Sequence, residues 1–367
     1  MKELFLLDPG VVFLNHGSFG ACPRPVFAEY QRLQLELERQ PAATLGPENY
    51  PTLIDRLRVT LASYVGADPG DIALVANATI GVNLIFRSLR LERGDEVVTT
   101  SHAYGGNIPL LQYVCERAGA RCIVVDTWPG DAADDILGAV TSRTHALLVD
   151  HISSATALRF PVQEICSRAR EAGVLTVVDG AHAPGQIALD VAAIGADFYV
   201  GNFHKWLCAP KGAGFLHARP DVQQLLEPLA VSWDWGAETW ADRHRWSGTR
   251  DPSAHLAVPA AIDFQAEHAW HKVRARCHDL AVRAERELIT LGAEPLAANG
   301  DEFVQMVAVR LPPCDAEALG RWLFDEHRIE VLAQNWRDSP VLRVSFQGYN
   351  DESDLDALLE ALPRALS

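Results

Sequence analysis

Side chains that could do chemistry follow two neighbouring apolar runs in the middle of this sequence. Lys205 comes after DFYVGN, between His204 and Trp206, and Asp179 ends LTVVD three residues before His182. A lysine is normally solvated at the protein surface, whereas these apolar neighbours offer its ammonium group little water. Desolvation lowers the pKa of an ammonium group, and the neutral amine is a nucleophile. The position therefore favours a reactive amine.

Two further segments could hold a phosphate group and a planar ring. Asn77, Ala78 and Thr79 precede a helical pattern, where free backbone N–H groups and the helix dipole attract anions. An ordinary helix N-cap would show the same residues and, taken alone, explains them better. Tyr104 and His102 follow the run DEVVTT, where an aromatic ring could cover a flat ligand or pack inside the protein.

Taken together, these groups match the needs of one cofactor. Asp179 follows an apolar strand, so its carboxylate should be partly desolvated and should need a cationic partner. Alone, Asp179 would be better explained as a helix cap. Pyridoxal 5'-phosphate needs a phosphate site, an aromatic cover, a carboxylate facing its protonated ring nitrogen and a lysine that condenses with its aldehyde. The sequence therefore predicts this cofactor, bound through Lys205.

The elements that would position these groups alternate between short apolar strands and amphipathic helices. Helical stretches such as IPLLQYVCERAG and PVQEICSRAREAG end at a glycine, which is typical of a helix C-terminus. This alternation predicts an α/β fold with a mostly parallel sheet, helices on both faces and ligands at the carboxyl ends of the strands. Strands are expected at residues 95–100, 121–126, 145–152, 175–182 and 197–202.

The pattern changes after Trp246. A long helical pattern from about 259 to 291 leads into the strand-like runs VQMVAVRL, IEVLAQ and VLRVSFQ, with a helix at DAEALGRWLFDEHR and another from Asp351. We expect a smaller α+β domain here. His268 and His271 have a helical spacing that suits a metal, but no third ligand is near, so a solvated helix face is expected and no metal site is predicted.

Composition limits the partners and the location. The formal net charge is −16, from 32 basic and 48 acidic residues spread along the chain, which argues against nucleic acid or an anionic membrane as a partner. Seven scattered cysteines without a C-x-x-C pair favour a reduced, cytoplasmic setting. Asp8 and Pro9 interrupt the N-terminal apolar run before a signal-peptide core could form, and no segment has the ~20 apolar residues of a membrane helix.

Six motifs together point to a family: FLNHGSFGACP, NATIGVN, DGAHAPG, GNFHKW, WSGTRDPSA and LRVSFQGYN. With them, nearly the whole chain resembles class V aminotransferase-fold enzymes of pyridoxal-phosphate fold type I, within the isopenicillin N epimerase-like branch. The resemblance implies an N-terminal arm at 1–25 that contributes to the active site. It further implies a large cofactor-binding α/β domain at 26–258, then a linking helix and a small C-terminal α+β domain at 259–367.

The resemblance also assigns roles to single residues. Lys205 would form the Schiff base, Asp179 would face the pyridine nitrogen, His182 would hydrogen-bond the ring oxygen and Arg343 would bind the substrate carboxylate. The other expected contacts are the phosphate ligands Ala78, Thr79 and His204 with Asn202 nearby, the cross-subunit phosphate ligand Thr249, and the substrate-side residues Asn15 and His16.

Two further implications concern the ring and the subunit interface. Where cysteine desulfurases of this class place a ring-stacking histidine, this sequence has Tyr104, with His102 as the fallback. The segment SGTRD resembles a stretch that reaches the partner subunit's phosphate, which implies a homodimer with active sites at the interface. The tryptophan-rich run VSWDWGAETWADRHRW could line a substrate entrance, but we expect it at the dimer interface, where tryptophan is enriched.

The resemblance leaves the reaction open among outcomes that share one step. Lys205, as base, would remove the Cα proton of an amino acid, and the resulting carbanion could be reprotonated to an epimer, lose a β-substituent or be transaminated. Epimerisation, the first expectation, needs a second acid on the face away from Lys205, for which Tyr104 and His16 are candidates. A β-lyase needs none, and relatives of this branch include C–S lyases acting on cysteine sulfoxides such as hercynylcysteine sulfoxide.

Two further possibilities receive less support from the residues. The segment IEVLAQNWRDSPVLR lacks the cysteine that cysteine desulfurases use before the carboxylate-binding arginine, and Cys314 is expected just ahead of a helix-capping aspartate. A protein of this fold that has lost catalysis and only binds a ligand is the alternative from a different class. Against it stands the intact set of Lys205, Asp179, His182 and Arg343.

Overall fold

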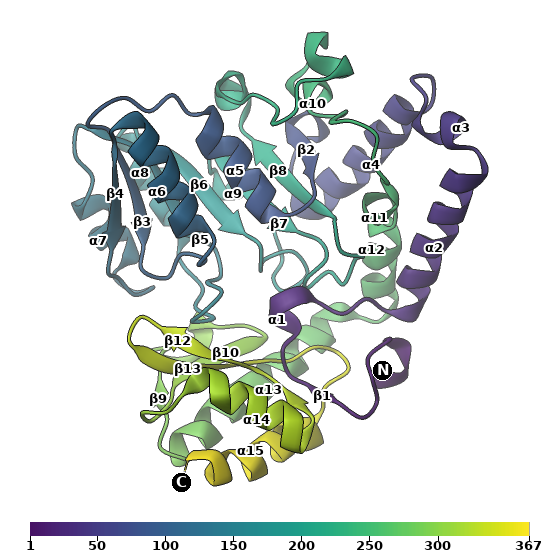
Figure 1. Cartoon of the computed structure of the whole chain (residues 1–367). Helices are drawn as coiled ribbons and strands as arrows, with labels where there is room; N and C mark the ends of the chain where they lie inside the picture. The colour runs from purple at the N-terminus through teal and green to yellow at the C-terminus, as the bar shows by residue number, and fades with distance from the viewer. Residues whose placement is uncertain (367) are drawn as a thin grey trace.

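A seven-stranded sheet forms the centre of the protein, whose computed structural model describes residues 1–366, with side chains up to residue 364 (Figure 1). The strand order is β2-β8-β7-β6-β5-β3-β4, and every pair is parallel except the two pairs made by β8. The mostly parallel sheet predicted from the sequence is thus confirmed. The strands are β2 (Ile72–Val75), β3 (Glu96–Thr100), β4 (Arg121–Val125), β5 (Thr144–Asp150), β6 (Leu175–Gly180), β7 (Phe198–Asn202) and β8 (Gly214–Ala218).

Helices cover both faces of this sheet (Figure 1). On β5, Leu147 and Val149 pack on one helical layer while Ala146 and Leu148 pack on the other, which explains why the strands are apolar at every position. The helices of this part are α2 (Arg24–Arg39), α3 (Pro41–Leu45), α4 (Tyr50–Val65), α5 (Ala78–Ser88), α6 (Asn107–Ala118), α7 (Ala132–Gly138), α8 (Val162–Glu171), α9 (Val191–Ile194), α10 (Trp240–Arg243), α11 (Ser253–Leu256) and α12 (Val258–Glu267).

The helix ends follow the local sequence. Gly119 ends α6 with φ +71°, a left-handed conformation that glycine adopts without strain, as the glycine-terminated pattern predicts. At the start of α5, the Asn77 side chain accepts a hydrogen bond of 3.0 Å from the backbone N–H of Ile80. This cap fixes the first turn of α5 at the carboxyl end of β2, beside the ends of β6 and β7.

A smaller antiparallel sheet, in the order β12-β13-β10-β9, forms the C-terminal part of the fold. Its strands are β9 (Glu294–Pro295), β10 (Met306–Arg310), β12 (Leu332–Trp336) and β13 (Ser339–Ser345), and the helices nearby are α13 (Trp270–Thr290), α14 (Ala316–His327) and α15 (Glu352–Leu366). Asp315 caps α14 by accepting from the N–H of Ala318, which confirms the turn expected at Cys314.

The single helix expected at 259–291 is instead two helices, α12 and α13. The chain breaks at Ala269, whose φ of 48° is left-handed. The physical reason is packing: α12 lies against α2 and α4 of the large part, whereas α13 lies against β10 of the small sheet. His268 and His271 therefore stand on opposite sides of a break rather than on one helix face.

The N-terminal arm joins the two parts. Strand β1 (Val12–Phe13) pairs in parallel with β11 (Ile329–Glu330), and α1 (His16–Phe19) then lies between the small sheet and the large one (Figure 1). Gly20 follows with φ +70°, and a side chain there would collide with the carbonyl oxygen of His204. The arm is thereby brought against the carboxyl ends of the central strands. Within residues 1–366, no helix combines the length and apolarity that crossing a membrane requires.

Candidate active site

A cavity of about 370 Å³ lies at the carboxyl ends of β5, β6 and β7, facing α1 and the small sheet. We call it the Lys205 cavity. It gathers residues from distant segments because parallel strands end at one edge of the sheet. Among the predicted site residues, those that line it are Ala78, Thr79, Tyr104, Asp179, His182, Asn202, His204, Lys205 and Arg343.

Lys205 follows β7 and is buried, as its apolar neighbours predict. Its Nζ atom lies 3.0 Å from Nε2 of His182. Burial, and next the charge of Arg343, lower the pKa of Lys205 to about 8, which places a substantial neutral fraction within reach of neutral pH. The backbone here is fixed as well, since the carbonyl oxygen of Lys205 accepts from the Cys208 N–H at 2.9 Å.

Asp179, on β6, is a fully buried carboxylate. Its Oδ2 accepts from Asn107 Nδ2 at 2.8 Å and its Oδ1 accepts from the Ala181 N–H at 3.0 Å. Burial raises its pKa, while these two hydrogen bonds favour the charged form. No cationic side chain lies within ion-pair distance of Asp179 among the described residues, so the carboxylate has a place for a positively charged group from a ligand.

Asp150, the last residue of β5, is a site residue that the sequence-based prediction missed. It pairs in register with Asp179 on β6 and lines the same cavity. Burial first, and the charge of Asp179 second, raise its pKa well above the ordinary value. Asp179 accepts hydrogen bonds of 2.8 and 3.0 Å, whereas Asp150 accepts the Tyr104 N–H at 3.4 Å and a backbone hydrogen bond from Ser154, and its pKa is the more strongly raised of the two, so Asp150 is the carboxyl group that takes up a proton more readily. One sequence feature could have revealed this role: like Asp179, Asp150 follows a valine at the end of an apolar strand.

The N-terminus of α5 forms the end of the cavity suited to an anion. The Ala78 N–H donates to Asn202 Oδ1 at 2.8 Å, so Asn202 couples this turn to the end of β7 and occupies the N–H that was expected to bind the phosphate. His204 donates from Nδ1 to the Ala213 carbonyl at 3.1 Å, and burial lowers its pKa to about 4. A phosphate beside it would oppose that effect of burial, because a negative charge favours the imidazolium form.

Arg343, on β13, is a buried guanidinium surrounded by neutral acceptors. It donates from Nη1 to the Ser154 carbonyl at 2.6 Å and from Nη2 to Ser18 Oγ at 2.9 Å and Asn15 Oδ1 at 3.3 Å. Its Nε atom has no partner, and no carboxylate lies within ion-pair distance in the described part of the chain. Burial lowers its pKa to about 10. A charge buried without a counter-ion is costly, so the site is suited to an incoming anion.

Tyr104 and His102, the two candidates for covering the ring, occupy different environments. Tyr104 is 41% exposed and lines the cavity, with its ring so close to Gly106 that a Cβ atom there would lie 2.7 Å from Cε1. His102 is buried, and its two nitrogens pair with Thr156 Oγ1 and the Thr127 carbonyl, each at 2.8 Å. His102 is thus a structural residue outside the cavity, and only Tyr104 stays a candidate.

His16 does not stand where the sequence-based expectation put it. It is fully buried outside the Lys205 cavity, with Nδ1 paired to the Tyr349 hydroxyl at 2.9 Å and Nε2 to the Lys205 carbonyl at 3.0 Å. Burial lowers its pKa to about 3. Its ring is thus committed to holding the lysine segment, and we do not retain it as a second acid or substrate ligand. Asn15 reaches the site only through its contact with Arg343.

Thr249 lies in the segment between α10 and α11 and does not line this cavity. A residue that serves the partner subunit's site need not touch its own, so its predicted role stays a prediction.

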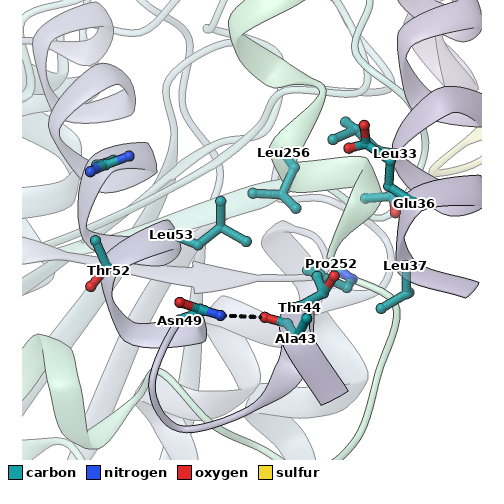
Figure 2. Close-up of a pocket in the computed structure, with 12 residues that line it drawn as sticks. Leu33, Glu36, Leu37, Ala43, Thr44, Asn49, Thr52, Leu53, Pro252 and Leu256 are labelled. Atoms are coloured by element: carbon teal, nitrogen blue, oxygen red, sulfur yellow. Dashed lines mark hydrogen bonds between the residues drawn. The ribbon is translucent and has the colours of Figure 1, made fainter. Parts of the chain in front are cut away.

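A second cavity, of about 380 Å³, lies between α2, α3, α4 and α11; Figure 2 shows its lining. We call it the α2–α4 cavity. Four of its twelve lining residues are leucines, Leu33, Leu37, Leu53 and Leu256, and a 2.8 Å hydrogen bond joins Asn49 Nδ2 to the Ala43 carbonyl (Figure 2). No lysine or histidine is among its described lining residues, and its charged groups are exposed, so it offers no buried reactive group.

The Lys205 cavity fits the predicted pyridoxal phosphate. The buried carboxylate of Asp179 suits a protonated ring nitrogen, the neutral amine of Lys205 suits an aldehyde, and the first turn of α5 suits a phosphate. Arg343 is left over for a second anion, the carboxylate of an amino acid. Lys205, Asp179 and Arg343 are buried without an oppositely charged side chain at ion-pair distance among the described residues, which a structural role alone does not explain.

Comparisons with known proteins agree with this chemistry. The model of the class-V aminotransferase family matches residues 39–358. The chain is 39% identical to the isopenicillin N epimerase of Streptomyces clavuligerus, across 97% of this chain and 95% of that protein. It is 30% identical to a probable chloroplastic L-cysteine desulfhydrase of Arabidopsis thaliana, across 97% of this chain and 83% of that protein.

A solved structure shares the fold. It is a complex between a cystine C–S lyase and its reaction product cysteine persulfide, with a TM-score of 0.87 and 23% sequence identity over 97% of this chain and 98% of that one. At this identity the likeness extends to the fold, the arrangement of the large sheet, the small sheet and their helices.

Proposed function

The chain belongs to the class-V aminotransferase family and is a pyridoxal-phosphate-dependent enzyme, and on that premise we propose that it epimerises an amino-acid substrate at Cα. The observation that supports this best is that one cavity is lined both by a lysine with a pKa near 8 and by the side chain of Tyr104. Epimerisation needs a base on one face of the substrate and an acid on the other.

Binding comes first, and the chain supplies its contacts from separate elements. Arg343 binds the substrate carboxylate through its guanidinium group, whose Nε has no partner among the described residues, and this pairing fixes the orientation of Cα. The start of α5 would hold the cofactor's phosphate, Asp179 would pair with its ring nitrogen, and Tyr104 would cover its ring. The proposed cofactor ligands are Ala78, Thr79, Tyr104, Asp179, His182, Asn202, His204 and Lys205, with Thr249 from the partner subunit.

The proton transfers follow from the charges and pKa values of the residues that line the cavity. When bound, pyridoxal phosphate supplies an aldehyde that condenses with amines and a ring that delocalises the electron pair of a broken Cα–H bond. Asp179, kept ionised by its two donors, holds a proton on the ring nitrogen. Lys205 removes the Cα proton as the neutral amine, and the Tyr104 hydroxyl returns a proton to the opposite face.

A second candidate function is β-elimination of a sulfur group, as in a C–S lyase. Two observations favour it: the 30% identical relative bears the name cysteine desulfhydrase, and His16 is no longer available as an acid on the second face. Elimination needs only Lys205 and room for the leaving group, so it makes fewer demands on this cavity than epimerisation does.

Assembly and organisation are proposed on the same premise. We propose a homodimer in which Thr249 completes the partner's phosphate site. The segment near it exposes apolar side chains, with Trp233 75% exposed and Val231 64% exposed, while Trp246 beneath is buried and stacks on Trp233 at 5.0 Å. The proposed division is an arm at 1–25, a large domain at 26–258 and a small domain at 259–367. A cytoplasmic location is proposed from the seven cysteines, which are all free thiols.

The test is incubation of the cofactor-loaded enzyme with single enantiomers of amino acids, including cysteine-derived thioethers and sulfoxides, in deuterated water. Epimerisation predicts deuterium at Cα together with inversion and no pyruvate. Pyruvate would establish the C–S lyase instead and would contradict the epimerase. Tyr104→Phe separates the two further, since it should abolish inversion while leaving elimination nearly intact.

A further inference from the structure

Three buried side chains form a hydrogen-bonded row that ends at the reactive lysine. The indole Nε1 of Trp206 donates to Nδ1 of His182 at 3.1 Å, and Nε2 of His182 lies 3.0 Å from Nζ of Lys205. Trp206 is fully buried, His182 is 2% exposed and Lys205 is 9% exposed, so water does not interrupt the row.

The chemistry of the indole decides where the proton of His182 sits. An indole N–H can only donate, so Nδ1 of His182 must accept and must lack a proton. Burial, and next the charge of Lys205, lower the pKa of His182 well below its ordinary value, so the ring is neutral. A neutral imidazole has one proton, and here that proton is on Nε2, the nitrogen that faces Lys205.

The proton on Nε2 in turn constrains Lys205. An ammonium group has three donors and no acceptor, so it cannot pair with an N–H that also donates. The neutral amine has a lone pair and can accept. We propose that Trp206 is a positioning residue: by fixing the proton of His182 on Nε2, it makes His182 a donor to Lys205 and favours the free amine of the lysine over its ammonium form.

Trp206 is itself fixed in place. Its carbonyl oxygen accepts from Gln265 Nε2 at 2.8 Å, and its ring lies beside the ring of His16, with centroids 5.0 Å apart. His16 also pairs with the Lys205 carbonyl. These contacts hold the backbone of Trp206 and one side of its ring, and the indole N–H points to His182 Nδ1.

Other charges also act on Lys205, but none of them belongs to Trp206. Burial is the largest effect and lowers the pKa of the lysine, Arg343 lowers it further, and Asp179 and Asp150 raise it. A substitution of Trp206 by another aromatic residue leaves these charges in place. The titratable and charged groups facing His182 and Lys205 from neighbouring elements are His16, Asp150, Asp179, His204 and Arg343.

The proton on Nε2 of His182 also affects binding of the cofactor, and this part of the inference alone rests on the proposed function. His182 presents an N–H from Nε2 rather than a lone pair, so it can donate to the ring oxygen of pyridoxal phosphate. The opposite tautomer would place a lone pair against that oxygen. Trp206 thereby selects the form of His182 that suits both the free lysine and the bound cofactor.

The first test reads the tautomer directly in the unaltered chain. Full-length protein is labelled with nitrogen-15 in its thirteen histidines, freed of cofactor, and studied by long-range proton–nitrogen correlation; the spectrum of His182→Gln identifies the signals of His182. We expect a protonated Nε2 and a bare Nδ1 that do not change between about pH 6 and about pH 9, a range spanning ordinary histidine and lysine pKa values. A protonated Nδ1 would overturn the proposal.

The second test compares two tryptophan variants. Trp206→Phe removes the donor, so the stronger charge-assisted bond from the lysine ammonium to a bare Nε2 becomes possible and the lysine stays protonated to higher pH. The readout is the rate at which cofactor-free chain captures pyridoxal 5'-phosphate, the amine and aldehyde forming a C=N bond with loss of one water, as a function of pH. We expect its midpoint to move up by about one pH unit.

Trp270→Phe is the matched control, because Trp270 is also buried but its Nε1 has no partner among the described residues. It should leave the midpoint unchanged. An unchanged midpoint in Trp206→Phe, or an equal shift in both variants, would overturn the proposal. Should Trp206→Phe fail to fold, the nitrogen spectrum of the unaltered chain decides alone. Failure to capture the aldehyde at all would contradict the proposed function, but it would not move the tautomer signals.

Discussion

The Lys205 cavity and the α2–α4 cavity have almost the same volume, about 370 and 380 Å³, yet they differ in what they bury. The first buries Lys205, Asp179 and Arg343 without pairing them to one another at ion-pair distance. The second is lined by leucines together with small and polar residues, and its charged residues Glu36 and Arg56 are exposed. Buried charged groups without an oppositely charged partner, rather than the volume of the cavity, therefore distinguish a reactive site from a packing gap.

Lys205→Ala should give the largest effect. Without the amine there is neither a nucleophile for the aldehyde nor a base for Cα, so Cα–deuterium exchange should fall by at least about 10³-fold. Lys272→Ala, at an exposed position, is the control and should keep full activity. Near-normal exchange in Lys205→Ala would remove the distinction between the two cavities.

Asp179→Asn and Asp150→Asn should differ although the two carboxylates are neighbours. Asp179 is the ionised member of the pair, so its amide variant should lose about 10²-fold in turnover because it cannot stabilise a protonated ring nitrogen. Asp150 has the more strongly raised pKa, and asparagine has nearly its shape, so its variant should lose less than about threefold. Equal losses would show that the proton is not placed on Asp150.

Arg343→Gln should act mainly on substrate binding. Loss of a charge-assisted pair with the carboxylate predicts a KM raised by about 10–100-fold with a smaller change in kcat. Arg310→Gln is the control from the neighbouring strand β10, since Arg310 pairs with Glu294 near the surface at 2.9 Å; its KM should change by less than about twofold. A loss confined to kcat would contradict the assigned role.

The ligand-binding ends of the strands could be predicted from the sequence. Short apolar runs end at Asp179 and at the His204–Lys205 pair, and such strand ends typically bind ligands in an open α/β sheet. All five predicted strands are present as β3 to β7, and the predicted residues that meet in one cavity come largely from those ends. Asp150 was missed because an aspartate after a strand is ordinary until the register places it beside Asp179.

The N-terminal arm and the linking helix were harder to predict from the sequence, because their structure depends on contacts with distant parts of the chain. His16 was expected in the site because its motif resembles the family's, but only the fold reveals that both of its ring nitrogens are occupied by Tyr349 and the Lys205 carbonyl. The break at Ala269 is likewise invisible in a continuous helical pattern, because it arises from α12 and α13 packing on different parts of the protein.

His16 should make the protein sensitive to acid. Its pKa is lowered from 6.5 to about 3, so between these values the unfolded chain binds a proton that the folded chain does not. Stability is therefore present above about pH 6.5 and is lost as pH falls, with a slope of up to about 1.4 kcal/mol per pH unit. Urea unfolding of His16→Gln should show a shallower slope than the unaltered chain; an identical slope would contradict the assignment.

Ser253→Ala should give the smallest effect. Ser253 lines the α2–α4 cavity, and its buried hydroxyl has only a weak interaction with the Asp251 carboxylate among the described residues, so removing it costs little. We expect the free energy of unfolding to change by less than about 1 kcal/mol and turnover by less than about twofold. A tenfold loss of turnover would show that this cavity takes part in catalysis and would break the comparison.

Mapping the lysine that captures the cofactor tests the central claim most directly. The chain has four lysines, Lys2, Lys205, Lys211 and Lys272. Pyridoxal 5'-phosphate is bound to the full-length enzyme, the adduct is reduced with borohydride, and the digested protein is analysed by mass spectrometry. We expect one modified residue, Lys205, with the label lost in Lys205→Ala. Modification of another lysine instead, or persistence of a stoichiometric label in Lys205→Ala, would contradict the assignment of Lys205 as the reactive amine.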